Sequence, residues 1–76
     1  METIELSDRR ENGGFLSYLY NDLVPDAMMM GGRGEIAFGG DRASIRLQVP
    51  DAERFSVRVL NSVSEVLCIG YKYRFL

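Results

Sequence analysis

The sequence contains no histidine, no tryptophan and a single cysteine, Cys68. Histidine is the side chain most often used in general acid–base catalysis, and a nucleophilic serine or cysteine needs an activating base. Zinc sites draw on clustered cysteine and histidine, which this chain cannot supply. A chain of 76 residues seldom forms the cleft that a pair of catalytic carboxylates requires. We therefore expect a protein that is not an enzyme and that carries no metal or cofactor.

Two other sequence patterns resemble ligand-binding motifs, but each is better explained without a bound ligand. Residues 31–34 read Gly-Gly-Arg-Gly, but the Gly-Lys-Ser/Thr ending of a phosphate-binding loop is missing and a strand follows where a helix is needed. We interpret this stretch as a flexible connector. Asp22 and Asp26 lie four residues apart without the spacing of a calcium-binding loop, and we expect them to be solvated charges.

Cysteine is too scarce for an intramolecular disulfide, which favours a reducing compartment. The first residues are acidic and alternating, unlike the basic and then apolar start of a secretory signal. The longest apolar run covers only residues 27–30, far short of the roughly 18–20 residues that span a bilayer. These features predict a soluble, cytoplasmic protein with no membrane partner.

The length predicts one small domain, residues 1–76, with an ordinary globular composition of 46% hydrophobic and 26% charged residues. The formal net charge is −2, but it is unevenly divided. Residues 1–38 carry three cations and seven anions, whereas residues 39–76 carry six cations and four anions. An acidic total opposes non-specific nucleic-acid binding, because attraction to phosphate supplies most of that affinity.

The first half of the chain predicts a strand over residues 3–6 and then a helix. Apolar side chains from Phe15 to Leu23 follow one helical face, with Asn12 as a plausible N-cap and Pro25 as the expected stop. An Asn-Gly hairpin with a strand after it is the alternative. Residues 25–34 are expected to form a loop.

The second half begins with a hairpin signal. A strand is predicted over residues 35–38, with Ile36 and Phe38 facing the core, and the glycines at 39–40 suit a tight turn. Strict alternation over residues 43–49 predicts a strand with one buried face. Residues 50–66 favour a helix, although β-branched valines keep a strand possible, and residues 67–75 alternate as a final strand.

This order predicts an α+β fold of the β-α-β-β-α-β, or ferredoxin-like split βαβ, type. The expected antiparallel sheet has four strands, with the first strand in a central position and two helices on one face. If the second helix is a strand, the alternative is an antiparallel meander with one helix.

The least ordinary feature is the methionine triplet in the predicted loop, because three adjacent apolar side chains cannot all reach one core. Methionine is flexible and polarizable, which suits adaptable contact surfaces. We therefore predict a non-catalytic protein-interaction module that docks on or occludes another protein, as small regulatory or phage-type inhibitors do. The candidate contact residues are Tyr18, Met28, Met29, Met30, Arg33, Arg46 and Arg74.

Two alternatives remain open. A nucleic acid could bind the open sheet face through its cations, Arg42, Arg46, Lys72 and Arg74. The aromatic side chains that RNA-recognition domains use for stacking are expected to be buried here, since Tyr71 and Tyr73 share the face of Ile69. The other alternative is a structural subunit of an oligomer, including a homodimer that pairs its last strands at an edge.

Overall fold

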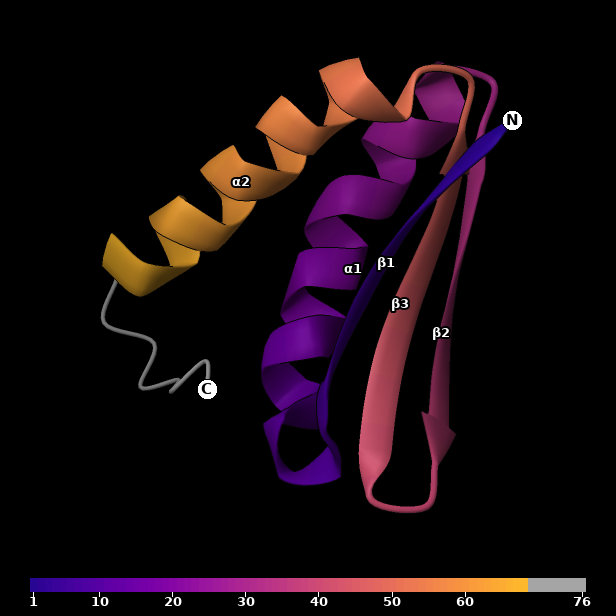
Figure 1. The fold of residues 1–76 in the computed structure, drawn as a ribbon. Helices are drawn as coiled ribbons and strands as arrows, with labels where there is room; N and C mark the ends of the chain where they lie inside the picture. The colour runs from indigo at the N-terminus through magenta and orange to yellow at the C-terminus, as the bar shows by residue number, and fades with distance from the viewer. Residues whose placement is uncertain (69–76) are drawn as a thin grey trace.

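The computed structural model describes residues 1–68, which form three strands and two long helices (Figure 1). The elements follow in the order β1 (Glu2–Arg9), a 3-10 turn (Arg10–Asn12), α1 (Gly13–Met29), β2 (Arg33–Gly39), β3 (Arg42–Val49) and α2 (Ala52–Cys68). This arrangement confirms the α+β class. It also shows that the meander alternative is wrong, because the segment after Pro50 is a helix.

The sheet has the order β1-β3-β2, and both outer strands pair antiparallel with β3. β1 and β2 are therefore parallel to each other, joined through α1, with β3 between them, which is the arrangement of a split βαβ unit. Among the described strands β1 lies at an edge, not in the predicted central position. The predicted last strand began at Leu67, but Leu67 and Cys68 belong to α2, and the rest of that prediction lies outside the described residues.

The core lies between one face of the sheet and both helices. It is made of Phe15, Leu16, Leu19, Leu23 and Ala27 from α1, Ala43, Ile45, Leu47 and Val49 from β3, and Phe55 and Val59 from α2. Every second residue of β3 is buried, as the alternation predicted. Phe38 does not join the core as expected, and 47% of it is exposed. It lies at the end of an edge strand, with the Arg10 guanidinium 5.8 Å from its ring centroid.

α1 does not stop at Pro25 but continues to Met29. Proline removes one backbone donor from a helix, yet Leu23 and Ala27 are fully buried on either side of it and hold the next turn against the sheet. The helix is terminated instead by Gly31, two residues after Met29, whose φ of 82° is readily available only to glycine. Asn12 precedes α1, but its side chain makes no capping hydrogen bond.

Two glycine hydrogen bonds close the end of α1. The Gly31 N–H donates to the Met28 carbonyl at 3.0 Å, and the Gly32 N–H donates to the Ala27 carbonyl at 2.9 Å. This pair of bonds is the Schellman motif that satisfies the last carbonyls of a helix. Gly31 and Gly32 thus terminate α1. The connection between α1 and β2 consists of residues 30–32 only, because residues 33 and 34, which were predicted to be part of a flexible connector, belong to β2.

Replacing Gly32 by alanine is expected to lower the free energy of unfolding by about 1–3 kcal/mol. A Cβ at Gly32 would collide with the Gln48 backbone carbonyl, which cannot move without distorting β3. Gly39→Ala is the matched control, because a Cβ there meets nothing within 4 Å and its φ is not positive. Urea unfolding of both variants measures the difference, and equal stabilities would contradict the close approach of the α1–β2 connection to β3.

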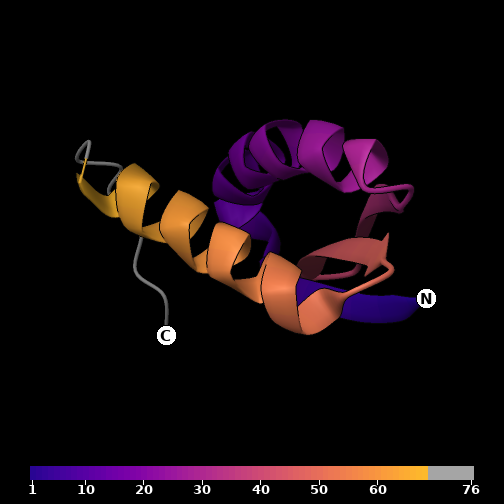
Figure 2. The same ribbon diagram turned by 90° about the horizontal axis from the view of Figure 1, so that it is seen from above.

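α2 begins at Ala52, within the stretch predicted as a helix, and has the acidic Glu53 in its first turn. The Asp51 carboxylate accepts the Arg54 backbone N–H at 3.1 Å, which is an N-cap interaction, and the Glu2 carboxylate of β1 accepts the Ala52 N–H at 2.9 Å. α2 then diverges from α1 and from the sheet along its length (Figures 1 and 2).

Candidate protein-binding surface

The methionine triplet lies at the end of α1, beside the start of α2, and not in a long loop as predicted. Met29 is 86% exposed and Met30 is 36% exposed. Both line a groove of about 430 Å³ together with Asp26, Arg54, Phe55 and Arg58, and we call this the methionine groove. Met28 is also exposed but points elsewhere, since successive helical residues are turned by about 100°.

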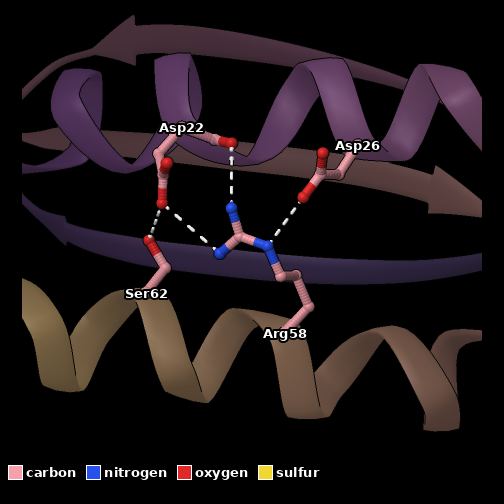
Figure 3. Close-up of polar contacts among 4 residues, drawn as sticks. All are labelled: Asp22, Asp26, Arg58 and Ser62. Carbon is pink, nitrogen blue, oxygen red and sulfur yellow. Dashed lines mark hydrogen bonds and ion pairs between the residues drawn. The ribbon is translucent and has the colours of Figure 1, made fainter.

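An ion-pair network joins the two helices beside this groove (Figure 3). The Arg58 guanidinium donates to the Asp26 carboxylate at 2.7 Å and contacts the Asp22 carboxylate and carbonyl oxygens, each at 3.4 Å. The buried Ser62 hydroxyl donates to the Asp22 carboxylate at 2.6 Å. The expectation that Asp22 and Asp26 are solvated charges is wrong, because their four-residue spacing places both on the side of α1 that meets α2.

Charge and hydrogen bonding within the network shift two pKa values. The Ser62 hydrogen bond, with smaller help from the hydrogen bond and charge of Arg58, lowers the pKa of Asp22 although burial opposes the change. The hydrogen bond to Asp26 raises the pKa of Arg58, with Asp22 adding to it. Both shifts favour the charged forms of Asp22 and Arg58, and the contacts of these residues join α1 to α2.

Ser62→Ala is expected to lower the free energy of unfolding by about 1 kcal/mol at pH 7, a modest figure because water screens the half-buried Asp22. A carboxyl whose pKa is lowered on folding contributes stability above its ordinary value of 3.8, and this contribution is lost as the pH falls through the lowered value. The difference between the wild type and the variant should therefore disappear in acid.

Urea unfolding at a series of pH values measures this difference. Ser56→Ala is the matched control, because the Ser56 hydroxyl donates to the Ala52 carbonyl of its own helix and touches no carboxylate. Its effect should not change with pH. A Ser62→Ala effect that stays unchanged over the whole acid range in which the protein remains folded would show that the hydroxyl does not act through Asp22.

Arg54 is the cation of the methionine groove that is left without an opposite charge. Its backbone N–H donates to the capping carboxylate of Asp51, but its exposed guanidinium has no ion-pair partner among the described residues. Arg58, one helical turn later, is neutralised by two aspartates. The floor of the groove is Phe55, which is only 2% exposed. The site thus combines an apolar floor and wall with one available positive charge.

The structure separates the predicted contact residues onto two faces. Tyr18 is a partly exposed residue of α1. It precedes Met29 by eleven residues, which is about three helical turns, so both residues lie on a similar side of the helix. Arg33 and Arg46 lie on the opposite side of the sheet from the helices, and neither lines the methionine groove. Arg74 lies outside the described residues.

The contact residues predicted from the sequence did not include Phe55, Arg54, Arg58 or Ser62. One sequence pattern could have indicated the contact between the two helices. Two aspartates on the first helix and two arginines on the second have the same four-residue spacing.

The outer sheet face is a charged surface whose arginines are engaged by neighbours. Arg46 contacts Glu5 at 3.2 Å and Glu35 at 3.6 Å, so it pairs with both neighbouring strands. Further contacts join Arg9 to Glu11, Arg33 to Gln48 and Arg42 to Ser7. The outward residues of the three described strands include no aromatic side chain. This face therefore offers phosphate contacts without stacking.

Comparisons with protein-family models, with curated proteins and with solved structures found no match. Within residues 1–68, no group of three or more acidic, cysteine or histidine side chains is placed to hold a metal ion. In the same part of the chain, neither helix has the length and apolar character needed to cross a membrane.

Proposed function

We propose that this protein is a non-catalytic binding module that docks on another protein through the methionine groove and so regulates or occludes it. The observation that carries the proposal is the position of Met29, which is 86% exposed at the rim of an apolar groove. Single exposed apolar residues are ordinary, but here Met29 and Met30 stand together over the buried ring of Phe55. Covering them would remove a continuous apolar surface from water.

The chemistry of the groove indicates the kind of partner. An apolar side chain fits between the two methionines and Phe55, because flexible thioether side chains adjust to the shape that they cover. A carboxylate next to that side chain would pair with Arg54, the cation without an opposite charge. The partner surface is therefore an acidic segment with a large apolar anchor, such as one face of an amphipathic helix.

The network around Arg58 makes the groove ready for binding. It joins the last turns of α1 to α2, so Met29, Met30 and Phe55 keep their relative positions before a partner arrives. A site that is already ordered loses less conformational entropy on binding. Only the methionine side chains then need to move, and they can adjust to the shape of the partner.

A peptide-display selection tests the proposal. The full chain is immobilised and a library of random 16-residue peptides is selected against it. The selected peptides are expected to share a large apolar residue flanked by Asp or Glu, and their affinity should fall when Arg54 is changed to Glu. The fall arises because the rim charge then repels the acidic flank.

Val57→Ser is the matched control, since Val57 is an exposed apolar residue of α2 that does not line the groove. Selected peptides should bind this variant like the wild type. Peptides that lack a common apolar and acidic pattern, or that bind the Arg54→Glu variant unchanged, would overturn the proposal. Steeply salt-dependent binding of an oligonucleotide, with no selected peptide, would favour the nucleic-acid alternative.

A further inference from the structure

Three arginines surround a hollow at the end of the molecule where α1 begins. The turn between β2 and β3 lies there beside the connection from β1 to α1, and the Arg10 N–H donates to the Asp41 carbonyl at 2.7 Å (Figure 1). The hollow has a volume of about 500 Å³ and is lined by Arg9, Arg10, Glu11, Asp41 and Arg42. We call it the arginine site. The methionine groove lies where α1 ends, and the two sites share no residue.

Uncharged groups hold the side chains of Arg10 and Arg42. The Arg10 guanidinium donates to the Gly40 carbonyl at 3.2 Å and lies 5.8 Å from the ring centroid of Phe38. The Arg42 guanidinium donates to the Ser7 hydroxyl at 3.1 Å. In the described part of the chain, neither guanidinium has an ion-pair partner. These contacts therefore order the two side chains without neutralising their charge.

The strand register places two positive charges of the arginine site directly opposite each other. Arg9 of β1 is paired with Arg42 of β3, and both residues are on the outer sheet face. Like charges at opposite positions of an antiparallel pair are destabilising. Glu11 contacts Arg9 only at 3.6 Å and between exposed side chains, so it offsets little of this repulsion. Arg46, on the same face, lies opposite Glu5 instead. A local departure from the stabilising pattern is typical of a functional site.

We propose that the arginine site binds a phosphate group, either free or carried as a monoester by a small molecule or a phosphorylated side chain. A guanidinium fork donates two parallel hydrogen bonds to phosphate oxygens. One fork satisfies a single carboxylate, whereas the three terminal oxygens of a phosphate monoester accept from two forks. A phosphate between Arg9 and Arg42 also replaces their mutual repulsion by attraction of both to the anion.

Two carboxylates limit the positive charge of the arginine site. Glu11 pairs with Arg9, and Asp41 lines the hollow without an ion-pair partner among the described residues. The lining therefore has three cations and two anions. With so small an excess, directed hydrogen bonds from the guanidinium groups hold the phosphate, rather than the extended positive field that a nucleic acid follows. The Asp41 carboxylate repels a bound phosphate, so neutralising it should tighten binding.

Titration of the full chain with inorganic phosphate, at an ionic strength kept constant with chloride, tests the proposal. The NMR signals of the Arg10 and Arg42 side-chain N–H groups should shift and saturate. Arg42→Gln should weaken binding at least fivefold, and Asp41→Asn should strengthen it about two- to fivefold. Arg33→Gln is the matched control and should bind phosphate like the wild type. Arg33 is another exposed arginine of the outer face that bonds a neutral side chain, but it does not line the hollow.

Two further ligands distinguish the sources of the phosphate group. Glycerol phosphate represents a small molecule, and a peptide with one phosphoserine represents a modified protein. The ligand that binds more tightly identifies the source, and equal affinities would assign recognition to the phosphate group alone.

Three results would overturn the proposal. The first is the absence of saturable shifts at Arg10 and Arg42, and the second is an equal loss of binding in Arg33→Gln and Arg42→Gln. The third is an oligonucleotide that binds more tightly than any phosphate monoester and is weakened equally by both variants, which would assign the arginines to a nucleic acid. The methionine groove takes no part in this experiment, so either proposal can fail without the other.

Discussion

Replacing Met29 and Met30 together by serine is expected to weaken the binding of a selected peptide by about ten- to a hundredfold. The two side chains form the apolar rim of the groove, and a partner that covers Phe55 must contact them. Serine removes the apolar area and leaves the backbone of the helix end in place. Most of the loss should be seen as faster dissociation, because interface changes of this kind act mainly on the off-rate.

The same double variant should keep its fold. Met29 makes little contact with the core, and Met30 lies just beyond the last turn of α1, so the free energy of unfolding should change by no more than about 1 kcal/mol. Fluorescence anisotropy measures the affinity and urea unfolding measures the stability. Met28→Ser is the closest control, since Met28 is exposed in the same turn but does not line the groove. Equal losses in the Met28 variant and the double variant would contradict the assignment of the site.

Ile45→Ala is expected to cost about 2–5 kcal/mol of stability, whereas Ile36→Ala should cost less than half as much. Ile45 and Ile36 face each other across β3 and β2, so the same change is made at paired positions. Ile45 lies on the central strand and is fully buried, while Ile36 lies on an edge strand and is only partly buried. The cavity left at the centre cannot be filled by water or by a shifting edge.

Thermal and urea unfolding measure both variants. A chain of this length has a net stability of only about 3–5 kcal/mol, so Ile45→Ala should leave a substantial fraction unfolded at 37 °C. Ile36→Ala should remain folded. If the two variants lose equal stability, then β3 is not the central strand of the sheet, and the order β1-β3-β2 is wrong.

Local patterns predicted the elements that depend on local chemistry. The strict alternation at 43–49 identified β3, and the glycine turn before it identified the hairpin, where Gly40 has a φ of 58°. The acidic start of α2 was also visible in the sequence. β1 extends to Arg9, beyond the predicted end at Leu6, because Ser44 to Arg42 on β3 supply partners for a polar stretch that shows no apolar pattern.

Tertiary packing decided the features that the sequence pattern missed. Pro25 was expected to end α1, but the buried Leu23 and Ala27 continue the helix and the Schellman bonds of Gly31 and Gly32 end it. The methionine triplet was identified as a contact surface from its composition alone. Phe55 and Arg54, which line the groove with Met29 and Met30, were not identified from the sequence. Their place beside the triplet depends on how α2 packs against α1.

NMR of the four methionine methyl groups tests the central claim most directly. The chain is labelled at the methionine methyl carbons and titrated with a selected acidic peptide. Met29 and Met30 should shift strongly, whereas Met28, which is exposed in the same turn but does not line the groove, should shift least and serves as the internal comparison. If the peptide binds while the Met29 and Met30 signals stay in place, the methionine groove is not the binding surface.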